Sequence, residues 1–355
     1  MATKAPLGGV RSSLKSSSAL EPVIVDREIC RQVAGLIESQ TIPTDREDTS
    51  LAGFTAKQVA NFYILLVAIC HQTSPRDEKP LEGIVGTRHL RGWDYLSNKL
   101  QVEAHSNPAI LSTSYWEQIT KRDVQELFRD DRAGDSLSDP DGRAKLIQDL
   151  GHKMRQHKWE SANEIYALSE HRIATGAPNL LTLLSQFRAY DDPVRKKSYF
   201  LLALMKNAGL WTYSDAYKLG APVDYHEIRG HLRIGTVRIC DPDMRSKLLN
   251  EKEVSSEEDI SIRLAVHRAL VLVSDYSGVR NPSQIHYMFW NIFRSCCTRH
   301  DPHCTFCPPT CSLPKRYVSL ALFPDGTRRC PFSEVCQSAG RDPKLLEPNV
   351  TTDYY

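Results

Sequence analysis

The sequence predicts a mainly α-helical protein. Apolar residues recur every three or four positions in many segments, as in 115–130, which is the spacing of an amphipathic helix. No segment shows the sustained alternation of apolar and polar residues that is typical of β-strands. The chain has 355 residues, of which 41% are hydrophobic and 25% charged, an ordinary balance for one large or two small globular domains.

Helices are expected at several places along the chain. The first covers 55–70, whose composition is apolar enough for a buried helix and whose Thr55 suits the N-cap position. A helix at 194–207 is expected to end before Gly209, since glycine is common just beyond helix ends. Segments 75–86 and 130–142 are rich in polar, turn-forming residues and are expected to be loops. The other helices are expected at 115–130, 144–157, 159–169, 179–187, 225–233, 260–273 and 283–294.

The ends of the chain and its charge limit the possible classes of protein. Residues 1–22 are rich in serine, lysine and glycine and are expected to be disordered, and 341–355 is expected to be an irregular tail. The N-terminus lacks the apolar core of a secretory signal, and no run reaches the roughly 18–20 apolar residues that cross a bilayer. We therefore expect a monomeric intracellular protein without a membrane partner, cytoplasmic or, in a eukaryote, nuclear. The net charge of +2 excludes a strongly basic nucleic-acid coat protein but permits a local basic patch.

Cysteines are concentrated near the C-terminal end. Seven of the ten lie between Cys296 and Cys336, after the helical body at 23–295 and within a segment, 296–340, that is expected to be a metal-binding loop. Their spacing is C-x6-C-x2-C, followed after an interval by C-x5-C. Thiolates bind zinc and iron–sulfur clusters, so both remain open, and His300 and His303 would suit a mixed zinc site. The competing interpretation is a set of unrelated buried thiols.

The cysteine spacing resembles the iron–sulfur loop of the endonuclease III and adenine-glycosylase branch of the helix-hairpin-helix DNA glycosylase superfamily. In that family the third cysteine follows an x2 step and also begins the x5 step. Here these two places fall on different residues, Cys307 and Cys330, with about twenty residues between them. The resemblance implies a [4Fe-4S] cluster, with zinc as the alternative. The implied ligands are Cys297, Cys304, Cys336 and either Cys307 or Cys330, with Cys311 as a further candidate.

A second segment, 222–235, resembles the stretch of the same superfamily that carries the catalytic aspartate. The family pattern is V-D-x-H-x-x-R-x-x-x-R-L/I-G, and Val223, Asp224, His226, Arg229, Arg233, Ile234 and Gly235 match it. The resemblance implies that Asp224 is catalytic and that His226 and Arg229 contact the substrate or DNA. The chemistry suits a carboxylate, because cleavage of an N-glycosidic bond builds positive charge on the sugar. The alternative interpretation of Asp224 is an ordinary helix N-cap.

Upstream segments supply two further candidates by resemblance. Bifunctional glycosylases place a nucleophilic lysine at the head of a helix, and Lys197 holds that position here, with Lys196 as the second choice. The alternative for these lysines is a basic run that contacts phosphate. The segment 68–74 resembles the glycosylase turn whose glutamine fills the base stack, a role that would fall to Gln72. The glycine hairpin L-P-G-V/I-G of the family is absent here. Archaeal 8-oxoguanine glycosylases and queuosine-nucleotide glycosylases, which have degenerate hairpins, are similar to this chain in the stretch.

The resemblance as a whole implies a mainly α, two-lobed helix-hairpin-helix glycosylase-like fold with a C-terminal cysteine-rich metal loop. Lys197 and Asp224 would meet in the cleft between the lobes, with Gln72 entering from the opposite side. The first hypothesis is a base-excision DNA glycosylase acting on duplex DNA with a damaged base, with lyase activity if Lys197 is the nucleophile. One alternative is an N-glycosidase of a free modified nucleotide, and the other is a non-catalytic protein that binds nucleic acid. An aromatic wall for the base could come from Trp116, Trp159, Trp211 or Trp290, although most tryptophans serve ordinary packing.

Overall fold

The computed structural model describes residues 21–38, 51–74, 76, 79–130, 132, 134, 137–279, 281–308 and 312–355. Most of the expected disordered N-terminus and the candidate ligand Cys311 lie outside these residues. Within them the fold is mainly helical, as the sequence predicts, and strands are short. None of the helices that the structure describes combines the length and apolar character needed to cross a membrane.

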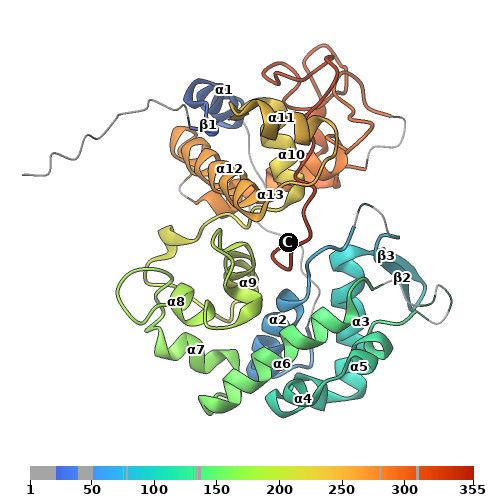
Figure 1. Cartoon of the computed structure of the whole chain (residues 1–355), viewed down its shortest axis with the longest axis vertical. Helices are drawn as coiled ribbons and strands as arrows, with labels where there is room; N and C mark the ends of the chain where they lie inside the picture. Colours follow the sequence, from blue (N-terminus) through green and yellow to red (C-terminus); the bar gives the residue numbers. More distant parts are fainter. Residues whose placement is uncertain are drawn as a thin grey trace, which may run out of the picture.

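The elements form two lobes, each with its own hydrophobic core (Figure 1). The first core draws on residues between Ala60 and Leu219, whereas the second joins residues from both ends of the chain. The first lobe contains α2 (Ala56–Ala68), β2 (Glu82–Val85), β3 (Arg88–Arg91), α3 (Gly92–Ser106), α4 (Thr113–Gln118), α5 (Lys121–Leu127), α6 (Pro140–Gln156), α7 (Ala162–Leu168), α8 (Leu180–Leu184) and α9 (Lys196–Asn207). The second contains β1 (Val23–Val25), α1 (Arg27–Glu38), α10 (Tyr225–Ile234), β4 (Val237–Ile239), α11 (Pro242–Leu249), α12 (Ser256–Tyr276) and α13 (Pro282–Ser295).

The core of the first lobe is organised around α2. Its residues from Ala60 to Ala68 are buried on every face, and the helix packs against α3, α6, α7 and α9. Thr55 begins the helix with a capping box, in which Thr55 and Gln58 each satisfy a backbone N–H of the other. The one amide within this apolar stretch, Asn61, donates to the carbonyls of Leu111 and Glu160, so burying it leaves its donors satisfied.

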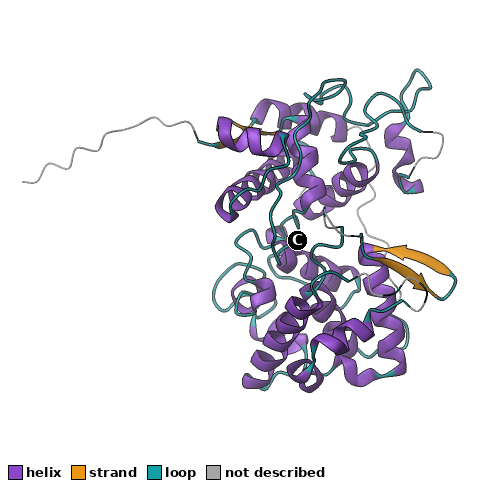
Figure 2. Cartoon of the chain, turned by 45° about the vertical axis from the view of Figure 1, so that its right-hand side comes forward, coloured by secondary structure: helices purple, strands orange, loops and turns teal. Residues whose placement is uncertain are grey.

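The second lobe brings the two ends of the chain together. Strand β1 pairs with β4 in antiparallel register, with Val23 opposite Ile239, and α1 packs against α12. The last residues then leave this lobe and return to the space between the lobes, where both views place the C-terminal end (Figures 1 and 2). This return places Tyr355 beside residues of the first lobe.

Two expectations about individual elements were wrong. Segment 115–130 is not one helix: it divides into α4 and α5, because Thr120 forms a capping box with Asp123 and starts a new helix. The expected loop at 75–86 contains strand β2, which pairs with β3 around a turn at Gly86, where φ is +65°. Figure 2 shows this hairpin at the edge of the first lobe. With four residues in each strand, the alternation was too short to detect from the sequence.

A candidate active site between the lobes

A cavity of about 270 Å³ opens between the two lobes. Both lobes line it: the first through the end of α2, the start of α3 and α9, and the second through the start of α10 and α13. Its walls are unusually rich in rings and include positive charges, which suits a flat, anionic ligand. The rings include those of Trp93, Phe200, Tyr225, Tyr287, Trp290 and Tyr355; the cations are Arg91, Lys196 and Arg294, and two carboxylates, Asp94 and Asp224, also line the cavity.

Asp224 borders this cavity as the N-cap residue of α10. Its Oδ1 accepts hydrogen bonds from the backbone N–H groups of His226 (2.8 Å) and Glu227 (3.3 Å). Its Oδ2 accepts from the Trp290 indole Nε1 at 2.8 Å. The two interpretations of Asp224 are therefore compatible, since the same carboxylate caps the helix and faces the cavity. These donors from α10 and α13 hold it in one orientation.

His226 also borders the cavity, in its neutral form. Its Nδ1 lies 2.9 Å from the Arg229 Nη2, and a guanidinium can only donate, so the imidazole proton resides on Nε2. Burial, followed by the charge of Arg229, lowers the pKa of His226 well below its usual range. The ring meets Trp290 edge-on, with centroids 6.1 Å apart. His226 can thus donate one hydrogen bond to a ligand but carries no charge.

Arg229 does not contact the cavity, in contrast to the role that the resemblance implies. Its Nη1 forms a buried ion pair with Glu347 at 2.9 Å, and its Nε donates to the carbonyl of Cys297 at 2.7 Å. Burial would raise the pKa of Glu347, but the charges of Arg229 and Arg299 outweigh burial and bring it to about 2. Arg229 is therefore a structural residue that joins α10 to the cysteine-rich segment and the C-terminal tail.

The two lysines at the start of α9 lie in the reverse of the expected positions: Lys196, not Lys197, borders the cavity. Lys196 borders the cavity, with its Nζ 3.5 Å from the Cys70 Sγ. Lys197 is fully buried and points away, donating to the carbonyl of Ala68 at 2.6 Å. Burial lowers the pKa of Lys197 to about 7, because a charged ammonium is poorly solvated there. The lysine that could contact a ligand is Lys196, and the structure does not bring Lys197 to the cavity that Asp224 borders.

Gln72 is near the cavity but does not line it; its neighbours Thr73 and Ser74 do. Its backbone is left-handed, with φ of +45°, and its N–H donates to the carbonyl of Tyr355 at 3.2 Å. Its main contact is therefore with the returning tail. The expected entry of its side chain from the side opposite Asp224 does not occur in this arrangement.

A pair that sequence reasoning missed lies directly behind Asp224. Glu227 is fully buried on α10, and its Oε1 lies 2.7 Å from Nδ1 of His286, a cavity residue on α13. Burial, and then the charge of Asp224, raises the pKa of Glu227 well above its usual range. The capping-box spacing D-x-x-E could have indicated Glu227, but no local pattern connects it to a histidine 59 positions away.

The tryptophan candidates include one that lines the cavity and three that pack in or against the core. Trp290 lines the cavity, whereas Trp116 and Trp211 are buried in the core of the first lobe and Trp159 packs against that core. Trp93 also lines the cavity and was not a candidate. No local signal distinguishes these tryptophans, because each belongs to an apolar surface whose partner is distant in the sequence.

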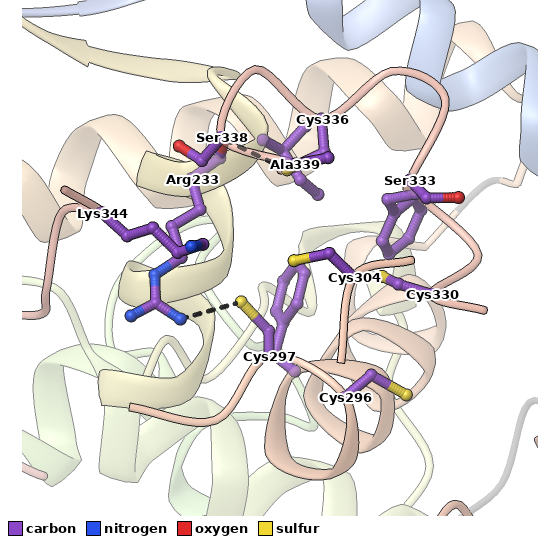
Figure 3. Close-up of a pocket in the computed structure, with 13 residues that line it drawn as sticks. Arg233, Cys296, Cys297, Cys304, Cys330, Ser333, Cys336, Ser338, Ala339 and Lys344 are labelled. Carbon is purple, nitrogen blue, oxygen red and sulfur yellow. Dashed lines mark hydrogen bonds between the residues drawn. The ribbon is translucent and has the colours of Figure 1, made fainter. Parts of the chain in front are cut away.

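Cysteines of the C-terminal segment gather around a second, smaller pocket in the second lobe (Figure 3). Cys297, Cys304, Cys330 and Cys336 all border it, and Cys296 does so as well. The Cys304 sulfur is directed toward the middle of the group and the Cys297 sulfur toward Arg233, whereas that of Cys296 points away (Figure 3). This arrangement brings the cysteines of the C-x6-C spacing, Cys297 and Cys304, together with those of the C-x5-C spacing, Cys330 and Cys336.

Cys330 rather than Cys307 completes this group. Cys307 does not border the pocket, and its backbone N–H bonds to the carbonyl of Arg328 at 2.9 Å. Cys330 is buried and its N–H reaches the carbonyl of Cys304 at 3.3 Å. The fold thus brings Cys304 and Cys330 to one pocket across the 25 residues between them.

The surroundings of the four thiols fit a bound metal cluster. Phe293 and Phe332 line the pocket and exclude water, and Arg233 donates to Cys297 Sγ at 3.4 Å, supplying positive charge beside the sulfurs. Arg233 also donates to the carbonyls of Thr298 and Arg299, which fixes the loop. As the side chains stand, no three His, Cys, Asp or Glu residues of the described part of the chain lie close enough to share a single ion.

No protein-family model and no curated protein sequence matches this chain.

Proposed function

We propose that this protein hydrolyses the N-glycosidic bond between a nucleobase and its sugar in the cavity between the lobes. The observation that carries the proposal is the position of Asp224. Its carboxylate is oriented by three donors at the edge of a cavity with aromatic walls and cations. Rings can hold a base by stacking, and the cations suit a phosphate.

Asp224 would act on the charge that develops as the bond breaks. When the base leaves, C1′ of the sugar acquires oxocarbenium character, and a fixed carboxylate stabilises that charge without having to reorganise. The indole N–H of Trp290 and the helix N–H groups hold the carboxylate in place during the step. A water molecule then adds to C1′, with Asp224 oriented to accept its proton.

The cysteine group supports a structural metal site as part of the same proposal. Cys297, Cys304, Cys330 and Cys336 would hold a [4Fe-4S] cluster, with zinc as the alternative. When bound, such a group supplies metal–thiolate bonds that tie the C-terminal segment to the second lobe. The buried contacts of Arg229 and Arg233 connect α10, which begins at the active site, to that segment.

Different observations favour each of two substrates that contain the base, duplex DNA and a free nucleotide. Arg91 and Arg294 are exposed beside the cavity, as expected of residues that meet the phosphates of duplex DNA with a damaged base. The returning tail favours a free modified nucleotide, because Tyr355 occupies part of the cavity wall and its carbonyl engages the backbone of Gln72. Salt separates the two substrates, since DNA binding weakens steeply with salt through counterion release.

The test is base release measured by mass spectrometry, with lesion-containing duplex DNA and modified mononucleotides as separate substrates. We expect Asp224→Asn to lower release by roughly 10²–10³-fold, since it removes one electrostatic stabiliser of the transition state. The variant should remain folded, because asparagine is a good N-cap. Asp241→Asn is the matched control: Asp241 caps α11, accepts from the Met244 N–H and does not line the cavity. Full turnover in Asp224→Asn, or no release by the wild type, would overturn the proposal.

A further inference from the structure

Cleavage of an N-glycosidic bond leaves electrons on the base, and Asp224 cannot neutralise them. A neutral base departs far more readily when an acid protonates it during the step. Such an acid must border the cavity, hold a proton at neutral pH and lie on the side of the base rather than behind the sugar. The cavity residues can be compared on these terms.

His226 is unsuited to this role. Arg229 donates to its Nδ1, and burial together with that positive charge keeps the imidazole neutral. A neutral imidazole with its proton on Nε2 and a guanidinium on Nδ1 has no second proton to replace one that it gives away.

His286 has a different partner. Its Nδ1 faces the Oε1 of Glu227 at 2.7 Å, and its ring borders the cavity. Glu227 is held in place by its capping-box contact, in which its Oε2 accepts from the Asp224 N–H at 3.3 Å. Both side chains are at least 95% buried, so the contact between them is shielded from water. Among the described residues, the charges of Asp224 and Lys196 act on Glu227: that of Asp224 raises its pKa and that of Lys196 lowers it.

We propose that Glu227 and His286 together form the general acid that protonates the departing base, a role that rests on the proposed N-glycosidase activity. The pair resembles the carboxylate–imidazole arrangement by which other enzymes orient a proton-transferring histidine. Burial and the nearby charge of Asp224 disfavour the carboxylate form of Glu227, so the pair retains its proton at neutral pH.

The proton and electron count closes. The pair begins with two protons: one between Glu227 Oε1 and His286 Nδ1, and one on His286 Nε2. As the C1′–N bond breaks, its electron pair goes to the base nitrogen and the Nε2 proton passes to the base. Glu227 is then a carboxylate that accepts from Nδ1–H of a neutral histidine. Water adds its oxygen to C1′ and loses one proton to Asp224, which then releases that proton to solvent, and a proton from solvent restores the pair.

The experiment compares a base that needs an acid with one that does not. The probes are 8-oxoguanine, which leaves as a neutral base, and 7-methylguanine, which is already cationic, each in duplex DNA and as a free deoxynucleotide. The variants are Glu227→Gln and His286→Asn, with His267→Asn as the control. Gln preserves the capping box but holds no transferable proton, and His267 is a part-buried histidine of α12 that does not line the cavity.

We expect both variants to lower 8-oxoguanine release by about 100-fold or more while lowering 7-methylguanine release less than about 5-fold. The control should release both bases at wild-type rates, and thermal unfolding should show that Glu227→Gln folds. Equal losses for the two bases, no loss for either, or an equal effect in the control would overturn the acid role while leaving the N-glycosidase intact. A wild type that releases neither base from either substrate would overturn both proposals.

Discussion

The buried ion pair between Asp192 and Arg263 joins the two lobes, and its removal should destabilise the protein strongly. Asp192 precedes α9 in the first lobe, and Arg263 is on α12 in the second. The guanidinium donates two hydrogen bonds to the carboxylate, at 2.9 and 2.6 Å, and both side chains are completely buried. The same carboxylate accepts from the N–H groups of Val194 and Lys196, so it also shapes the start of α9.

The magnitude follows from these contacts. A hydrogen bond to a charged group contributes about 1.5–3 kcal/mol. In Asp192→Asn a single side-chain oxygen remains for the donors that two carboxylate oxygens serve in the wild type. The new N–H₂ group would face the Arg263 guanidinium, which is itself a donor. Breaking a buried pair from one side costs about 3–5 kcal/mol. Here the remaining Arg263 charge is not solvated, and Asp259, 3.8 Å away, compensates it in part. We therefore expect Asp192→Asn to lower the free energy of unfolding by about 3–5 kcal/mol.

Urea titration followed by circular dichroism measures this loss. The control is Glu160→Gln, which removes an exposed pair with Lys57 and should cost less than about 1 kcal/mol. The double variant Asp192→Asn/Arg263→Met removes both charges of this pair and should recover part of the loss, while the buried Asp259, 3.8 Å from Arg263, keeps the recovery from being complete. A cost for Asp192→Asn that is no larger than that of the exposed control would refute the reasoning.

Three further predictions concern the site, the tail and the cysteines. Base release should fall by at least tenfold more in Lys196→Met than in Lys197→Met, because only Lys196 borders the cavity; equal losses in steady-state assays would contradict this placement. The pKa of Glu347 is about 2 in the folded protein against 4.5 as its ordinary value, so its stabilisation is complete above pH 4.5 and is lost as the pH falls toward 2. This amounts to roughly 3 kcal/mol, and acid titration of unfolding free energy should show it in the wild type and not in Glu347→Gln. Finally, Cys330→Ser should lose bound metal in elemental analysis while Cys307→Ser retains it, since only Cys330 borders the pocket; the reverse result would restore Cys307 as the ligand.

Local sequence patterns were sufficient for many of the elements. The apolar periodicity predicted α2, α6, α9, α12 and α13 because each helix buries a face or its whole surface in a core. The capping side chain of Thr55 was also readable, since an N-cap bonds to N–H groups only two or three residues away. At 115–130 the apolar pattern continues across Thr120 although the helix does not.

The candidate site could be predicted only in part. Asp224 was identified because its segment matches a pattern, and the structure adds that Trp290, 66 positions away, orients its carboxylate. Choosing between Lys196 and Lys197 requires the rotation of α9 about its axis, because successive residues on a helix point about 100° apart. Sequence alone gives that rotation only when one face is clearly polar, and much of α9 is buried on several sides.

The sequence by itself therefore determined the helical class and the two cysteine spacings and offered the cap at Asp224 as one of two interpretations, since each depends on residues within a few positions. Only the tertiary structure decided which cysteine joins the group, that Arg229 serves Glu347 and the cysteine-rich segment, and that Glu227 meets His286. The physical reason is that the contacts of Glu227 and Arg229 link residues 59 or more positions apart, and Cys330 meets Cys304 across 26 positions. Their geometry is set by how two separately packed cores and a returning tail fit together, which no local pattern encodes.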